Sequence, residues 1–255
     1  MCLSRAGRAA LATVGGMEAR RERPAALDPH HHADVSGGWL RPAVFGAMDG
    51  LVTNIALIAG MGGGGAAPRT IVLAGTAGLV AGAISMALGE YTSVRTQNEQ
   101  IAAEVAKERA ELARYPEAEA EELAQIWIGR GLPEELARQM ADALKDHPEQ
   151  ALRMHTQEEL GVSPTEAPSP RVAAFSSFGC FAVGAVLPLL PYLLGGEQLW
   201  PALAAGGGGL FAAGAIAARF TRRSWWRSGT RQLLFGAAAA TATFLIGLAI
   251  GANGG

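Results

Sequence analysis

The hydrophobic residues of this chain are concentrated in five long runs instead of being spread at the spacing of a soluble core. Each run is close to the roughly 20 residues that a helix needs to cross a bilayer. The pattern therefore predicts an all-α membrane protein with five transmembrane helices. The runs cover residues 45–61, 70–88, 172–194, 199–218 and 233–250.

A polar block separates the second run from the third. The helical pattern of the second run meets no proline or turn signal until Pro116, so one helix from Ile71 would be about 60 Å long and would project into the cytosol. Prolines then mark the starts of three further predicted helices. These read "PEAEAEELAQIWIGRGL", "PEELARQMADALKD" and "PEQALRMHTQEELG".

These patterns divide the chain into four predicted parts. Residues 1–38 are a disordered tail without the features of a signal peptide, and residues 39–90 hold the first two membrane helices. Residues 91–170 form a cytosolic helical domain, and residues 171–255 hold the last three membrane helices. The proline-rich stretch "VSPTEAPSPR" is the predicted linker from this domain back to the membrane.

Charge distinguishes the inserted domain from the rest of the chain. Residues 91–170 include 16 acidic and 8 basic residues, a net charge of −8, whereas the remainder carries a net charge of +6. Such an acidic insert favours cations as partners and disfavours nucleic acid. The two cysteines, Cys2 and Cys180, supply neither a disulfide framework nor a thiolate metal motif.

Basic residues predict the orientation in the membrane. They crowd the stretch "ARFTRRSWWRSGTRQ" between the fourth and fifth runs, and Arg41 precedes the first run. Because positive ends remain in the cytoplasm, the N-terminus and the insert are expected inside and the C-terminus outside, with only Arg69 opposing this assignment. The alanine- and glycine-rich composition, without an organelle-targeting signal, leads us to expect a bacterial plasma membrane.

Three side chains within the membrane are candidates for an ion path. Asp49 is a carboxylate in the first third of a membrane helix, where it costs at least about 2.5 kcal/mol and is usually retained for a pathway, a relay or a partner. Met86 and Glu90 are four residues apart and share a helix face. A carboxylate with a thioether suits divalent transition metals. The alternatives are packing for Met86, a helix-end hydrogen bond for Asp49 and solvation for Glu90.

The insert offers a second set of ligands, because carboxylates recur at helical spacing on one face of two predicted helices, and a methionine and a carboxylate share one face of a third. Helix bundles can enclose ions between such faces, although acidic faces are more often simply solvated. The tail adds His30, His31 and His32, a local metal-binding composition. The candidate ligands in the insert are Glu104, Glu108, Glu111, Glu119, Glu122, Met154 and Glu158.

Small residues recur at close-packing intervals in the membrane helices, including Gly75, Gly78 and Gly82. Faces of this kind let helices approach one another. The sequence leaves two interpretations open: the glycines pack helices within one chain, or they form a dimer interface.

Five segments together resemble the vacuolar iron transporter family over residues 39–252. The resemblance implies a homodimer that moves Fe²⁺, and often Mn²⁺, out of the cytosol in exchange for protons, without a prosthetic group. The segments are "FGAMDGLVTNIALIAG", "AGAISMALGEYTSVRTQ", "ERAELARYPEAEAEELAQIWIGRGL", "LRMHTQEELG" and "FGCFAVGAVLPLLPYLL".

Carried across by motif, the resemblance assigns Asp49 and Met86 to the translocation path at the dimer interface. It assigns the ligands of a cytosolic metal-binding domain to the positions of Glu108, Glu111, Glu119, Glu122, Met154 and Glu158. His155 stands where a second methionine can occur, so the site is expected to be harder and more pH-sensitive. Pro42 and Gly78 replace acidic residues found in plant members, and Glu90 is expected to take over part of the proton coupling.

Other functions remain open at this stage. A manganese-preferring exporter would use the same ligands, which discriminate poorly between Fe²⁺ and Mn²⁺ and could also bind Zn²⁺ or Co²⁺. A membrane metal sensor or store that does not transport is a second alternative. An oxidase with two iron ions is disfavoured, because the insert has no Glu-x-x-His pair.

Overall fold

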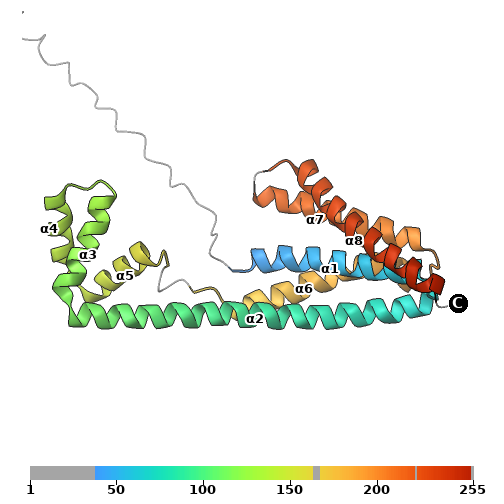
Figure 1. The fold of residues 1–255 in the computed structure, drawn as a ribbon, viewed down its shortest axis with the longest axis horizontal. Helices are drawn as coiled ribbons and strands as arrows, with labels where there is room; N and C mark the ends of the chain where they lie inside the picture. Colours follow the sequence, from blue (N-terminus) through green and yellow to red (C-terminus); the bar gives the residue numbers. More distant parts are fainter. Residues whose placement is uncertain (1–37, 163–166, 222, 254–255) are drawn as a thin grey trace, which may run out of the picture. The chain divides into compact units, whose positions relative to one another are not determined.

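The computed structural model describes residues 38–162, 167–221 and 223–253, which form eight helices and no strand within those ranges (Figure 1). The predicted tail up to residue 37 and its histidines His30, His31 and His32 lie outside the described residues. The helices are α1 (Leu40–Gly63), α2 (Pro68–Arg114), α3 (Pro116–Gly129), α4 (Glu134–Leu144), α5 (Pro148–Glu159), α6 (Pro170–Leu193), α7 (Leu199–Phe220) and α8 (Trp225–Asn253).

Five of these helices are long and apolar enough to cross a membrane, namely α1, α2, α6, α7 and α8. Four of them contain a predicted run in full, and α6 contains the run 172–194 up to Leu193, which confirms the all-helical membrane fold. The helix α8 begins at Trp225, well before the predicted Leu233. The run was too short because hydropathy marks where a segment becomes apolar, whereas the polar turns before it continue the same helix.

The helix α2 continues from the apolar part into the polar insert, as the missing turn signal predicted. It has 47 residues, carries Pro68 in its first turn and ends at Arg114, directly before Pro116 starts α3. Proline suits a first helical turn because its absent N–H has no partner there in any case. The helices α3 and α5 both begin with proline, whereas Pro133 is the residue that precedes α4.

In the membrane part, α1 packs against α2, α6, α7 and α8. The contact with α6 is close: a Cβ atom on Gly46 would lie 2.6 Å from the carbonyl oxygen of Ser177, so a side chain there would collide with backbone. The predicted small face of α2 is covered within the same chain. Leu189 occupies the space beside Gly75, and Phe181 occupies that beside Gly82. At these two positions the glycines pack helices within one chain.

The insert has its own apolar core between α3 and α4. Leu123 and Trp127 from α3 pack with Ala137 and Ala141 from α4, and Met154 of α5 packs against them. The helix α5 also contacts α2 and α3, and this placement brings the last insert helix against the polar half of α2.

Candidate metal-binding sites

A cleft of about 320 Å³ between α1, α2 and α6 brings together the three residues predicted for the ion path. Asp49 lines it from α1, and Met86 and Glu90 line it from successive turns of α2. The Thr53 hydroxyl, one turn along α1, donates a hydrogen bond to Oδ1 of Asp49 at 3.3 Å. The cleft therefore offers carboxylate oxygens and a thioether within one space.

Burial differs among the three residues. Glu90 is only 7% exposed, and its Oε2 has no hydrogen-bond partner in the described part of the chain. The alternative that Glu90 is simply a solvated interfacial group is therefore wrong. Asp49 and Met86 are half-buried, and Met86 packs against the cluster of Ala83 and Phe181. A buried carboxylate oxygen without a donor favours a proton or a cation beside it.

A buried amide next to this cleft was missed by the sequence reasoning. Asn54 is fully buried, and its Nδ2 donates to the carbonyl oxygens of Ala185 at 2.7 Å and Gly75 at 3.3 Å. One side chain thus connects α1 to α2 and α6. Its signal in the sequence was a polar amide inside an otherwise apolar run, one turn or so from Asp49. Such residues in membrane helices often form interhelical hydrogen bonds.

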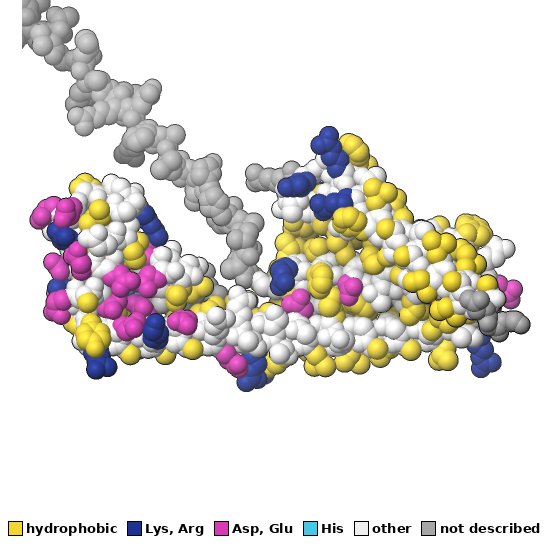
Figure 2. Space-filling view, viewed as in Figure 1, with side chains coloured by type: hydrophobic (Ala, Val, Ile, Leu, Met, Phe, Trp, Pro, Cys, Tyr) yellow, Lys and Arg dark blue, Asp and Glu magenta, His cyan; other side chains and the backbone are white. Residues whose placement is uncertain are grey.

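The second site lies in the insert, over which Figure 2 shows acidic side chains gathered. Nδ1 of His155 on α5 lies 2.9 Å from Oε1 of Glu159 and 3.1 Å from Oε1 of Glu108 on α2. Oε2 of Glu119 on α3 is 3.8 Å from the same nitrogen. Ligand atoms of Glu108, His155 and Glu159 all lie within 4.8 Å of one another, close enough for one cation to contact all three. We call the side chains of Glu108, Glu119, His155 and Glu159 the His155 cluster.

Burial and mutual repulsion alter the proton affinity of the cluster. The pKa of Glu108, in the polar half of α2 beyond the apolar run, is raised to about 7, first by burial and then by the charge of Glu159. The pKa of Glu119 is raised as well, by burial and by the charge of Glu122. The imidazole of His155 opposes both shifts. A divalent cation would relieve the same repulsion.

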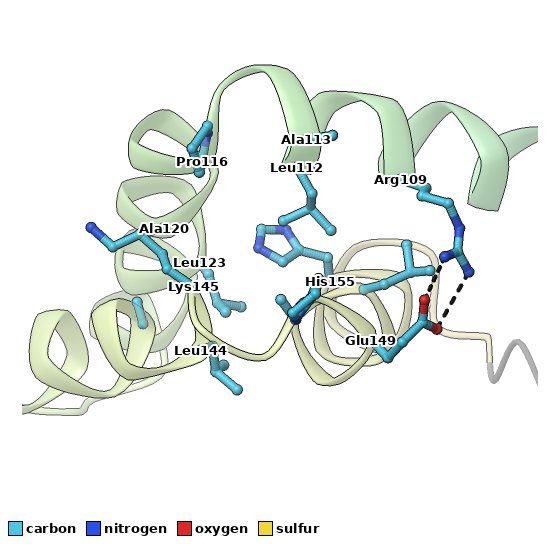
Figure 3. A pocket seen from close by; sticks show the side chains of 14 residues that line it. Arg109, Leu112, Ala113, Pro116, Ala120, Leu123, Leu144, Lys145, Glu149 and His155 are labelled. Carbon is cyan, nitrogen blue, oxygen red and sulfur yellow. Dashed lines mark hydrogen bonds and ion pairs between the residues drawn. The ribbon is translucent and has the colours of Figure 1, made fainter.

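An apolar cavity lies on the other side of the imidazole. Its volume is about 150 Å³, and Leu112, Leu123 and Leu144 contribute to its walls. Figure 3 shows the ring of His155 projecting into this space, with Arg109 and Glu149 paired at its edge. The ring is thus held between leucine side chains and carboxylates, an arrangement that fixes its orientation.

The structure separates the predicted insert ligands into two groups. Glu108 and Glu119 belong to the His155 cluster, and Glu111 and Glu122 lie close enough for their charges to raise the pKa of Glu119. The remaining three lie elsewhere. Glu104 is exposed, Met154 packs on the core of α3 and α4, and Glu158 pairs with Arg130 and accepts a hydrogen bond of 3.4 Å from Trp127 Nε1.

One member of the cluster, Glu159, was absent from the predicted ligands, and His155 was predicted only as the residue that takes the place of a second methionine at the site. The two residues are four residues apart on α5, a spacing that places both on one helix face. That spacing was available in the sequence. Which of the neighbouring carboxylates, Glu158 or Glu159, turns inward depends on how α5 docks on α2 and α3.

Comparison with known proteins identifies the family to which the chain is similar. A sequence model of the VIT family matches residues 40–248. Vacuolar iron transporter 1 of Oryza sativa subsp. japonica is 31% identical over 245 residues, which cover 92% of this chain and 96% of that protein. Vacuolar iron transporter 1 of Eucalyptus grandis is 33% identical over 186 residues, covering 71% of this chain and 74% of that protein.

A third relative, the vacuolar iron transporter of Acanthamoeba castellanii, is 38% identical over 169 residues, which cover 65% of this chain and 60% of that protein. These relatives come from plants and an amoeba. The expectation of a bacterial member is not borne out by them.

Proposed function

The chain belongs to the VIT family, and we propose that it exports Fe²⁺ from the cytosol in exchange for protons. It is a metal-ion transporter of the membrane and not an enzyme. The observation that carries the proposal is the cleft in which Asp49, Met86 and Glu90 meet inside the membrane part. Its ligand set suits a divalent transition metal better than Ca²⁺ or Mg²⁺.

In this proposal the insert captures the ion on the cytosolic side. The His155 cluster combines three carboxylates with one imidazole, and it lies in an insert with a net charge of −8 that attracts cations. Imidazole and carboxylate together accept Fe²⁺ and Mn²⁺ alike. The neighbouring Glu111 and Glu122 would add negative charge around the bound ion.

The second step passes the ion to Asp49, Met86 and Glu90 between two copies of the chain. The cleft is open to the surface, and Phe45, which lines it, is 55% exposed. A half-exposed carboxylate on such a face would meet hydrocarbon, which is costly. A second copy related by two-fold symmetry would cover it and supply a second set of the same ligands. We therefore propose a homodimer with the path at its interface.

Proton exchange follows from the chemistry of the ligands. Carboxylates bind the metal only when deprotonated, so a proton that arrives from the far side competes with the ion. The unpaired oxygen of buried Glu90 makes this residue our candidate for the proton-coupling group, with Asp49 as the principal ion ligand.

Flux of Fe²⁺ into sealed proteoliposomes, under an imposed pH gradient and with a pH dye inside, tests the proposal. We expect uptake that needs the gradient and moves protons in the opposite direction. Asp49→Ala should abolish it, whereas Glu197→Gln, which removes an exposed carboxylate between α6 and α7, should leave it unchanged. Transport retained in Asp49→Ala would remove Asp49 from the mechanism.

The same proteoliposomes distinguish the proposed function from two alternative functions. Faster uptake of Mn²⁺ than of Fe²⁺ would indicate a manganese-preferring exporter. A membrane metal sensor or store is favoured by one observation, namely that the His155 cluster is complete without the membrane cleft. Tight binding of the metal without any flux would support that function.

A further inference from the structure

A second polar cleft, of about 400 Å³, lies where α7 leads into α8. Its lining consists of Arg223, Ser224, Arg227, Ser228 and Arg231. Figure 2 shows dark blue side chains gathered at this turn. The cleft shares no lining residue with the cleft of Asp49 or with the His155 cluster, and neither metal site accounts for it.

The charges that line this cleft are not balanced by any carboxylate that the structure describes. Within the described ranges, no carboxylate pairs with Arg223, Arg227 or Arg231, whereas Arg109 and Arg138 of the insert both pair with glutamates. Three guanidinium groups along one cleft repel one another. The first turn of α8 also has no acidic residue and contains Arg227, a cation at the end of the helix where the dipole favours anions. One bound anion would offset both unfavourable effects.

The floor of the cleft is built from packed groups. Ser228 is only 7% exposed, and no described residue forms a hydrogen bond with its hydroxyl, which lines the cleft. A Cβ atom on Gly214 of α7 would lie 2.6 Å from the carbonyl oxygen of Ser228, so the two backbones touch there. The rings of Phe211 and Trp225 pack edge to face with centroids 5.9 Å apart. These contacts hold the start of α8 in place beside α7.

We propose that this cleft binds a phosphate group, carried by an anionic phospholipid of the adjacent leaflet. Arginine binds phosphate oxygens through paired N–H donors, and the Ser224 and Ser228 hydroxyls can supply further donors. Backbone N–H groups at a helix start add to such a site. The proposal depends on the chain spanning a membrane and not on the transport of iron.

The neighbouring tryptophans identify a lipid as the source of the phosphate. Trp225 and Trp226 are 59% and 51% exposed, and the guanidinium of Arg227 lies 5.3 Å from the ring centroid of Trp226. Exposed tryptophans concentrate at the level of the lipid headgroups, where basic side chains meet anionic lipids. The apolar run of α8 begins at Leu233, two residues after Arg231, so the cleft stands at the edge of the hydrocarbon.

Native mass spectrometry of the full chain in detergent tests this proposal, with dioleoyl-phosphatidylglycerol titrated as the probe. The variant Arg223→Gln/Arg227→Gln/Arg231→Gln should bind the first phosphatidylglycerol at least about tenfold more weakly than the unmodified chain. The matched control removes three exposed arginines at the starts of other helices and should change the affinity less than about twofold. These control positions are Arg41, Arg69 and Arg171.

Two further titrations, one with a second lipid and one with inorganic phosphate, complete the test. Dioleoyl-phosphatidylcholine should bind more weakly than phosphatidylglycerol, and inorganic phosphate at an equal concentration should not displace the lipid. Equal weakening in the cleft variant and the control would overturn the site. Displacement by inorganic phosphate would overturn the lipid as its source. If the triple variant does not fold, Arg227→Gln alone should still weaken binding about threefold, and an unchanged affinity would also overturn the proposal.

Discussion

Nδ1 of His155 lies 3.1 Å from Oε1 of Glu108, and this contact joins α5 to α2 inside the insert. Glu159 and Glu119 face the same nitrogen, at 2.9 and 3.8 Å. One imidazolium could neutralise only one of the three carboxylates, so negative charge remains in a largely buried place. A divalent cation, whose binding displaces protons from its ligands, would neutralise more of this negative charge than a single proton does.

Removal of the imidazole should weaken metal binding. We expect His155→Ala to reduce the affinity of the full chain for Mn²⁺ at least about tenfold, because the metal loses its only nitrogen ligand and the carboxylates lose the group that orients them. Isothermal titration with Mn²⁺, which does not oxidise readily, measures the effect. The exposed His147 supplies the control, since His147→Ala removes the same ring outside the cluster. Equal affinities of the two variants would remove His155 from the site.

The raised pKa of Glu108 predicts how the stability of the metal-free protein depends on pH. The pKa is about 7 in the folded chain and 4.5 in its ordinary state, so between these values the folded protein binds more protons than the unfolded one. This contribution to stability is therefore complete below about pH 4.5 and is lost as the pH rises through about 7. Glu119 acts in the same direction.

Thermal unfolding of the metal-free chain should accordingly show a melting temperature that falls between about pH 5 and pH 7.5. Glu108→Gln should flatten this slope, whereas Glu104→Gln, which changes an exposed carboxylate of the same helix, should preserve it. Saturating Mn²⁺ should reverse the trend, because deprotonated ligands bind the ion more tightly. A slope unaffected by Glu108→Gln would show that this carboxyl does not titrate in the window.

Glu90 should separate proton coupling from ion passage. Its buried Oε2 has no hydrogen-bond partner among the described residues, so a neutral amide can occupy the same space. We expect Glu90→Gln to retain Fe²⁺ uptake down a concentration gradient and to lose most of the acceleration by an opposing pH gradient. Parallel recordings of Fe²⁺ and pH in proteoliposomes measure the ratio of the two fluxes. An unchanged ratio would exclude Glu90 as the coupling group.

Asn54 should matter for stability more than for binding. Its side chain donates to carbonyl oxygens of Ala185 and Gly75 and thereby connects three membrane helices. We expect Asn54→Ala to lower the free energy of unfolding by about 1–3 kcal/mol, from the lost hydrogen bonds and the space left behind. Unfolding in a denaturing detergent measures this loss. Thr76→Ala, at an exposed position of α2, should change it by less than about 0.5 kcal/mol.

The pattern of the chain predicted most of the helices because each depends on nearby residues. Five apolar runs located the membrane helices, and Pro116 located the end of α2. The cleft of Asp49, Met86 and Glu90 was also foreseeable in part, since charges and a thioether stand out against apolar neighbours. Hydropathy could not locate the start of α8, because the helix begins in a polar stretch.

The amino-acid sequence by itself determined which segments enter the membrane and which helix faces carry carboxylates, since both follow from periodicity along single helices. Only the tertiary structure decided which faces meet. It turned Glu159 toward Glu108 and Glu158 toward Arg130, although the two residues are neighbours. It also buried Glu90 and Asn54. The physical reason is that burial and proximity depend on how helices pack against one another, and local pattern does not encode that packing.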